Sequence, residues 1–139
     1  MVANPAGFQV VFDYGSPRII SGYAREVLSG GWCVTVSGAS AAVSSGANSF
    51  ATSDLKFGQA SGLDFTGVAM HTAASGALVS VCIGGAVILT AAGTILSGRN
   101  IACNGAQAVV EATTAGHTIG RALSSAGSEG YCLVEIGRL

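Results

Sequence analysis

The stretch GVAMHTAASGALVSVCIG, residues 67–84, returns 53 positions later as GRALSSAGSEGYCLVEIG, residues 120–137. About two identities are expected by chance between segments of this length and composition. The alignment has seven among 18 pairs, namely Gly67/Gly120, Ala69/Ala122, Ala73/Ala126, Ser75/Ser128, Val81/Val134, Ile83/Ile136 and Gly84/Gly137. The sequence therefore predicts two related units within its 139 residues.

Strand patterns dominate both copies of the repeat and the segments around them. Val79, Val81 and Ile83 alternate with Ser80 and Cys82, which is the period of a strand with one buried face. Other short segments are rich in β-branched and aromatic residues and are followed closely by turn-forming residues. We expect strands over residues 8–12, 32–36, 78–83, 86–89, 108–111 and 131–136, and helix only as a turn over residues 22–28, 39–47 or 123–128.

A second similarity extends both units toward the N-terminus, because LSG at residues 28–30 recurs at residues 96–98. The units then span about 28–84 and 96–137, and the first unit has the longer insert. Two such units bury their apolar faces either by packing against each other or by closing into one barrel. We expect an all-β, small single-domain fold, β-barrel or β-sandwich-like, over residues 21–139.

Residues 1–20 lie outside both units, and Pro5 and Pro17 favour an extended N-terminal arm. A terminal segment has little core in which to bury aromatic side chains, so its aromatics are candidate partner contacts, with core positions as the alternative. Charged residues beside the arm are candidates for orienting such a contact, because charges are scarce in this chain. The candidate contact residues are Phe8, Phe12, Tyr14, Arg18, Arg25 and Glu26.

The composition argues against nucleic acids and membranes as partners. Charged residues make up 9% of the chain, the net charge is -1, and no basic run is present. The sequence therefore has no concentration of positive charge that would bind a phosphate backbone. The apolar stretch 79–96 contains Gly84-Gly85 and Gly93, which we interpret as turns, so we expect no membrane span. No leader pattern is visible at the N-terminus, and we expect synthesis in a cytosol.

Reactive side chains form no catalytic pattern. The sequence has no nucleophile elbow, no phosphate-binding loop and no zinc-protease motif. A metal cluster of His71, His117, Cys82 and Cys103 is the alternative to ordinary packing of these residues. The four cysteines lack a C-x-x-C pair, and we expect them to be small buried apolar residues. The sequence predicts no enzyme activity, no cofactor and no metal.

Single charges are scattered along the rest of the chain. Isolated charges are usually solvated, but in a protein with so few of them they also serve as rim contacts that set the orientation of a partner. Both interpretations stay open for Asp54, Lys56, Asp64, Arg99, Glu111 and Arg121.

Several Gly/Ala-rich segments resemble the capsid decoration (head cement) proteins of tailed viruses. They are AREVLSGG at 24–31, TGVA at 66–69, GGAVIL at 84–89, AGTILSG at 92–98, TIGRAL at 118–123 and LVEI at 133–136. The resemblance implies a compact β domain on the outer surface of an icosahedral head, with an arm along the major capsid protein. It also implies a homotrimer at threefold or quasi-threefold positions that clamps adjacent capsid subunits, and it carries no catalytic or metal residues.

Two other classes of function remain as alternatives. One is a tail- or fibre-associated β module of a virion, which would have the same composition and the same lack of catalytic motifs. The other is a small β-barrel enzyme or ligand carrier, for which His71 and His117 are the side chains to test.

Overall fold

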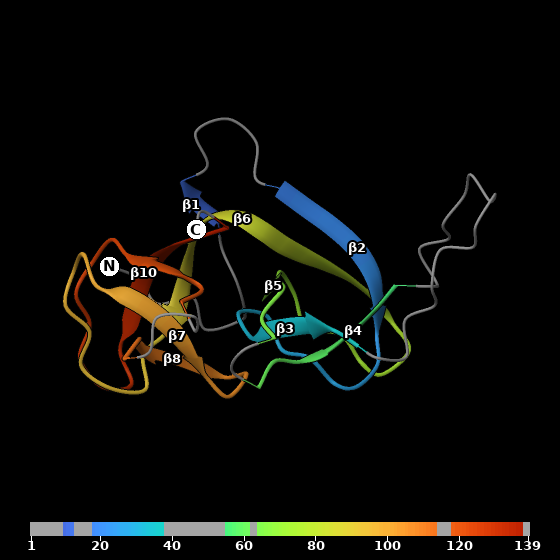
Figure 1. Cartoon of the computed structure of the whole chain (residues 1–139). Coiled ribbons are helices and arrows are strands. Elements are labelled where there is room, and N and C mark those ends of the chain that lie inside the picture. The colour runs from blue at the N-terminus through green and yellow to red at the C-terminus, as the bar shows by residue number, and fades with distance from the viewer. Residues whose placement is uncertain (1–9, 13–17, 38–54, 62–63, 114–117, 138–139) are drawn as a thin grey trace.

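The described part of the chain contains ten strands. The structure is a computed structural model that describes residues 10–12, 18–37, 55–61, 64–113 and 118–137. These ranges contain no helix, and hence none that is long and apolar enough to cross a membrane, and the expected all-β class is confirmed. The strands, drawn in Figure 1, are β1 (Val10–Phe12), β2 (Arg18–Ala24), β3 (Cys33–Val36), β4 (Lys56–Gln59), β5 (Gly67–Ala69), β6 (Leu78–Thr90), β7 (Asn100–Asn104), β8 (Ala108–Glu111), β9 (Gly120–Ala122) and β10 (Tyr131–Ile136).

β6 is a strand of 13 residues that belongs to both halves of the molecule. Its first half, up to Gly84, pairs with β2 and β5, and its second half, from Gly85, pairs with β10 and β1. The turn that the sequence predicts at Gly84-Gly85 is wrong, because the strand continues through both residues. Gly85 has a φ of 132°, where a side chain would be strained, so the glycine pair lets the strand bend instead of ending.

The first barrel consists of β2, β4, β3, β5 and the first half of β6, in that spatial order. It closes because β2 also pairs antiparallel with β6. The contact between β2 and β4 is parallel and short, with Tyr23 opposite Lys56 and Ala24 opposite Phe57. The barrel encloses a cluster of buried apolar side chains made of Ala24, Leu28, Val34, Phe57, Ala69, Ala73, Val79 and Val81.

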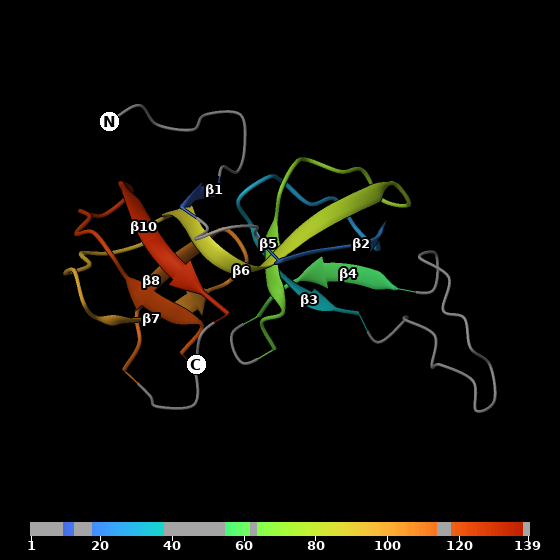
Figure 2. The ribbon, with the colours of Figure 1, turned by 90° about the horizontal axis from the view of Figure 1, so that it is seen from above.

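The second barrel repeats this order, with the second half of β6 in the place of β2. The strands β10, β9, β7 and β8 follow β6 in space. β8 returns to the end of β6 through a parallel bridge between Ala91 and Val109, and the Ala92 N–H donates to the Val109 carbonyl at 2.8 Å. Figure 2 shows the two barrels side by side, with β6 passing from one to the other.

The internal repeat predicted from the sequence is present in the strand registers. Ala69 lies opposite Val81 in the first barrel, and 53 positions later Ala122 lies opposite Val134 in the second. The bridges Leu28–Ala73 and Ile95–Ala126 are likewise equivalent. Leu28 is therefore equivalent to Ile95, one position away from the match that the LSG similarity predicts. Each repeated unit also begins one strand earlier than expected, at β2 and at the second half of β6.

Two further segments differ from the sequence analysis. The helical turn proposed for residues 22–28 is wrong, because Gly22 to Ala24 are strand residues that pair with β6 and β4. Residues 18–20, which the sequence analysis places in the arm, are the first residues of β2. Before them, β1 pairs antiparallel with β6, with Val10 opposite Val87. The described part of the N-terminal segment thus runs along β6.

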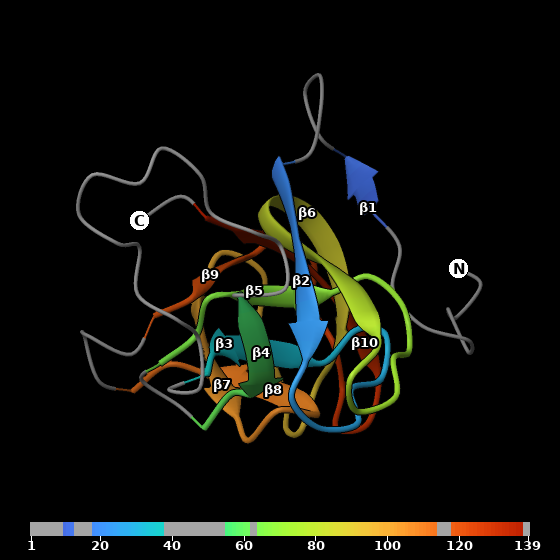
Figure 3. The same cartoon turned by 90° about the vertical axis from the view of Figure 1, so that its right-hand side faces the viewer.

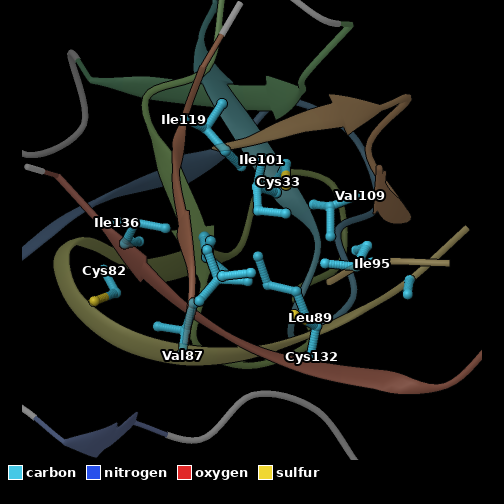
Figure 4. Close-up of a cluster of buried hydrophobic side chains, with 14 of the residues drawn as sticks. Cys33, Cys82, Val87, Leu89, Ile95, Ile101, Val109, Ile119, Cys132 and Ile136 are labelled. Atoms are coloured by element: carbon cyan, nitrogen blue, oxygen red, sulfur yellow. The ribbon is translucent and has the colours of Figure 1, made fainter. Parts of the chain in front are cut away.

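A larger buried cluster joins the two barrels. Cys33, Val68 and Cys82 are neighbours across β3, β5 and β6, and none of them is more than 1% exposed. They alternate with residues that face the interior of the first barrel, so their side chains point outward. There they pack with residues of the second barrel, including Val87, Leu89, Ile101, Val109 and Ile136, as Figure 4 shows. The two barrels therefore form one packed body.

Candidate partner-binding surface

The aromatic residues of the arm are described only in part. Phe8 and Tyr14 lie outside the described residues. Phe12 is the last residue of β1, and its backbone lies opposite Ala86 of β6. In Figure 3, β1 lies beside the second half of β6 and β2 lies beside its first half. The role of the three aromatics as partner contacts stays a prediction.

Arg18 connects the beginning of β2 with the end of β10. Its Nη2 donates to the main-chain carbonyl of Gly137 at 2.8 Å. Its guanidinium lies over Gly84, where a Cβ atom would overlap it. The side chain is exposed, but its hydrogen bond to the chain's own backbone fixes the strand ends and gives Arg18 a structural role beside the predicted partner contact.

Arg25 and Glu26 follow β2 directly and have different surroundings. The Glu26 Oε2 accepts a hydrogen bond from the Gln59 N–H at 3.0 Å and would lie only 2.9 Å from a Cβ atom at Gly58. Glu26 thus holds the end of β4. Arg25 is exposed, and its carbonyl accepts a hydrogen bond from the Ser75 hydroxyl at 3.0 Å. Of this pair, Arg25 presents the more accessible charge.

Three of the scattered charges come together around one pocket on the second barrel. The pocket has a volume of about 370 Å³ and is lined by Gly98, Arg99, Asn100, Glu111, Ala112 and Arg121. Asn100 and Arg121 are paired across β7 and β9, and the Glu111 Oε2 accepts a hydrogen bond from the Leu96 N–H at 2.8 Å. Two guanidinium groups beside one carboxylate suit a carboxylate or a main-chain carbonyl of a partner. If Arg99, Glu111 and Arg121 act as rim contacts, this pocket is where they would meet a partner.

In the second barrel, this polar pocket lies on the face whose equivalent in the first barrel packs against the second barrel. In the first barrel the cross-strand row is Cys33, Val68 and Cys82, and the equivalent row in the second barrel is Asn100, Arg121 and Glu135. The first row is buried, whereas Asn100 and Arg121 are exposed. The sequence analysis did not identify Asn100 or Glu135. The sequence repeat could have identified Glu135, because it aligns the apolar residues Cys82 and Val68 with the charged residues Glu135 and Arg121.

Two of the cysteines approach each other between the barrels. The Cys33 thiol is hydrogen-bonded to Cys103, which raises the pKa of Cys33 and lowers that of Cys103, with burial opposing the second effect. Burial raises the pKa of the Cys82 and Cys132 thiols. All four cysteines are free, and three of them are buried as expected, whereas Cys103 is half-buried.

Metal-binding groups do not gather in the described ranges, where no three His, Cys, Asp or Glu residues lie close enough to hold an ion. His71 is exposed, and its Nε2 accepts a hydrogen bond from the Ser80 N–H at 3.2 Å. His117 lies outside the described residues. The alternative cluster of both histidines with Cys82 and Cys103 is therefore not assembled by the residues that the structure describes.

The arrangement of two barrels has a counterpart among solved structures. One similar structure is that of the head fiber gp8.5 N base in bacteriophage phi29. The two share a TM-score of 0.61 over 87% of this chain and 94% of that chain, with 16% sequence identity. At this identity the likeness shows a common fold. No family model matches the sequence, and no curated protein gives a significant match.

Proposed function

We propose that this chain is a structural protein of a bacteriophage virion and attaches to the outer surface of the head. The observation that carries the proposal is the likeness of nearly the whole chain to the head fiber base of phage phi29. The resemblance of its sequence to capsid decoration proteins points to the same surface. On this proposal the protein is made in the host cytoplasm and then joins the virion.

In its first form, the protein decorates the head and clamps adjacent major capsid protein subunits as a homotrimer at threefold or quasi-threefold positions. A protein that binds only the mature shell stabilises it by about 2.7 kcal/mol per site when its free concentration is 100 times the dissociation constant. Small energies of this size add up over many sites. The work is done by adhesion, so no enzyme activity, cofactor, nucleic acid or membrane is involved.

In its second form, the chain is the base of a head fibre and anchors a longer appendage. The fold likeness itself favours this form, because the similar domain is the base of such a fibre. Both forms use the same outer surface of the head. They differ in the number of copies on each head and in what projects from them.

Electron microscopy of labelled protein on purified heads that lack it tests the proposal and separates its forms. An even coat supports decoration, and projecting fibres at many sites support the fibre base. A single label at the tail vertex would support the tail-associated alternative. Failure to bind heads under conditions that preserve the fold would contradict the proposal.

The arm provides a second test on the same heads. Removing residues 1–12 deletes β1 and leaves β2 intact, and we expect weaker head binding with an unchanged circular dichroism spectrum. Removing residues 1–7, which keeps β1, is the matched control. Head binding by both truncated proteins that equals that of the full chain would contradict a role for the arm in attachment.

A further inference from the structure

The polar pocket of the second barrel is built on the strands β7, β8 and β9. Ala112 follows β8, and its N–H donates to the Asn100 carbonyl of β7 at 2.8 Å. Arg121 of β9 lies opposite Asn100. Arg99 precedes β7, and its carbonyl accepts the Ala122 N–H at 2.8 Å. Main-chain hydrogen bonds therefore fix the backbone from which both arginine side chains of the pocket extend.

The charged side chains of the pocket differ in their partners. Glu111 is half-buried, and its Oε2 accepts the Leu96 N–H at 2.8 Å, so the chain's own backbone fixes this carboxylate. Arg99 and Arg121 are exposed, and among the described residues neither guanidinium has an ion pair or a hydrogen bond. Glu135 lies opposite Arg121 on β10 but does not line the pocket. The lining thus has two positive charges, one negative charge and unused N–H donors.

An excess of one positive charge suits a single carboxylate. A guanidinium group offers paired N–H donors that match the two oxygens of a carboxylate. A phosphate monoester carries close to two negative charges at neutral pH, and the second would lie near Glu111 without a partner of its own. The Asn100 amide both donates and accepts, which suits the peptide groups beside an acidic residue. The volume of about 370 Å³ lies within the range of ligand pockets, about 300–1,000 Å³.

Two exposed leucines lie beside the pocket. Leu96, whose N–H donates to Glu111, is 51% exposed. Leu123 is 46% exposed and stands two positions after Arg121, so alternation along the strand places both on the same face. The Leu123 N–H donates to the Leu133 carbonyl of β10 at 2.7 Å, so the pairing with β10 continues to this residue. An apolar residue next to a bound acidic residue would cover these leucines.

The repeat favours protein over a free ion as the ligand of this face. The equivalent face of the first barrel, with Val68 in the place of Arg121, is buried and packs against the second barrel. The same backbone arrangement thus already forms one contact with protein. In the second barrel it carries two of the six Lys and Arg residues of the chain, and a partner there needs the opposite charge.

We propose that the pocket binds an acidic peptide segment of another protein, with one Asp or Glu carboxylate between Arg99 and Arg121 and an apolar neighbour beside Leu96 and Leu123. All the lining residues lie in the described ranges. Residues 114–117, which adjoin the pocket in sequence, contain no acidic residue. Binding of such a segment is independent of attachment to a head and goes beyond the proposed function.

Nuclear magnetic resonance of the isotope-labelled full chain tests the proposal with a capped peptide. The probe is acetyl-Ala-Leu-Glu-Ala-amide, and its matched control has Gln in place of Glu. We expect the Glu peptide to shift the amide signals of Arg99, Asn100 and Arg121. We expect the Gln peptide to bind about tenfold more weakly, because hydrogen bonds to a charged group are the stronger ones. Equal binding of the two peptides, or no binding of either, would overturn the proposal.

Substitutions locate the binding in the pocket. Arg99→Gln and Arg121→Gln each remove one guanidinium, and each should weaken binding of the Glu peptide about tenfold. Arg121→Lys keeps the charge without the paired donors and should have an intermediate effect. Arg25→Gln removes an exposed positive charge outside the pocket and should bind like the unmodified protein. An equal loss in Arg25→Gln would mean unspecific attraction and overturn the proposal.

Thermal unfolding checks that the variants are folded, and Arg99→Gln decides the matter if Arg121→Gln is not. Sodium acetate and inorganic phosphate distinguish a peptide site from a general anion site. Binding of either ion as tight as that of the Glu peptide would overturn the proposal. Light scattering covers a second copy as the ligand: an oligomer that Arg121→Gln converts to a monomer would overturn it too. Each of these outcomes leaves the proposed function intact, since none involves heads.

Discussion

Gly22 shows how one small residue adjusts the volume of a barrel interior. A Cβ atom there would lie 2.6 Å from the Leu55 carbonyl oxygen and 2.8 Å from the Phe57 ring. At the equivalent positions of the second barrel, Leu89 and Val109 replace Gly22 and Phe57. The first barrel thus combines the smallest residue with a large ring, and the second combines two side chains of middle size. Both combinations fill the interior, since all the side chains involved are buried.

We therefore expect Gly22→Ala to lower the free energy of unfolding by about 1–3 kcal/mol, because a backbone oxygen cannot move aside as a side chain can. Gly93→Ala is the matched control, since a Cβ atom at Gly93 meets nothing within 4 Å. Urea unfolding of the two variants measures the difference. Equal stability of the two would show that the interior of the first barrel is looser than described.

The hydrogen-bonded thiols of Cys33 and Cys103 predict that alkylation will be selective for one cysteine. Hydrogen bonding from Cys33 lowers the pKa of Cys103, so at a given pH more of Cys103 is in the reactive thiolate form than of an ordinary cysteine. Cys33, Cys82 and Cys132 are buried and have raised pKa values. We expect iodoacetamide to modify Cys103 first, which peptide mass spectrometry detects.

The dependence on pH provides the control for this reaction. Replacing Cys33 with Ala removes the hydrogen bond, so the pKa of Cys103 rises and the alkylation rate reaches its midpoint at a higher pH. A midpoint that does not move in Cys33→Ala would contradict the hydrogen bond as the cause.

At the scale of elements, the two turns before β6 and β10 have the same shape but different residues. Gly76 has a φ of 84°, and its equivalent Glu129 has a φ of 64°, the only positive φ outside glycine among the described residues. Each N–H donates to an equivalent carbonyl, Gly76 to Ala24 and Glu129 to Ala91. The left-handed conformation costs a residue with a side chain roughly 1–2 kcal/mol.

Glu129→Gly should therefore raise the free energy of unfolding by about 0.5–1 kcal/mol, after the greater freedom of glycine in the unfolded chain is subtracted. Gly76→Ala should lower it by about 1 kcal/mol for the same reason. Glu129→Gln, which removes only the charge, is the control and should change little. Chemical denaturation measures all three, and a Glu129→Gly variant less stable than Glu129→Gln would contradict the strained turn.

At the scale of the molecule, the repeat gives a matched pair of positions with opposite surroundings. Val68 is fully buried between the barrels, and its equivalent Arg121 is exposed beside the polar pocket. Val68→Arg buries a charge without a partner and should cost about 3–5 kcal/mol, enough to unfold a marginal domain.

The reverse substitution supplies the comparison. Arg121→Val changes an exposed side chain and should alter the free energy of unfolding by no more than about 0.5 kcal/mol. Thermal unfolding of both variants tests whether the barrels pack through the row of Cys33, Val68 and Cys82. A small effect of Val68→Arg would mean that they do not.

The repeat at an offset of 53 residues determined more of this protein than any single strand pattern. Identical pairs such as Ala69/Ala122 and Val81/Val134 occupy equivalent registers, because the same small and β-branched residues satisfy the same interior. Strands of three residues, such as β5 and β9, are too short to show a period. The sequence also did not show that β6 continues through Gly84-Gly85, because two consecutive glycines are equally typical of a turn.

By itself, then, the sequence determined an all-β chain of two related units with few charges. Only the tertiary structure decided that the units share β6 and that Val68 is covered while Arg121 is exposed. The reason is physical: alternation along a strand records which residues share a face. What covers that face depends on contacts between residues far apart in the chain.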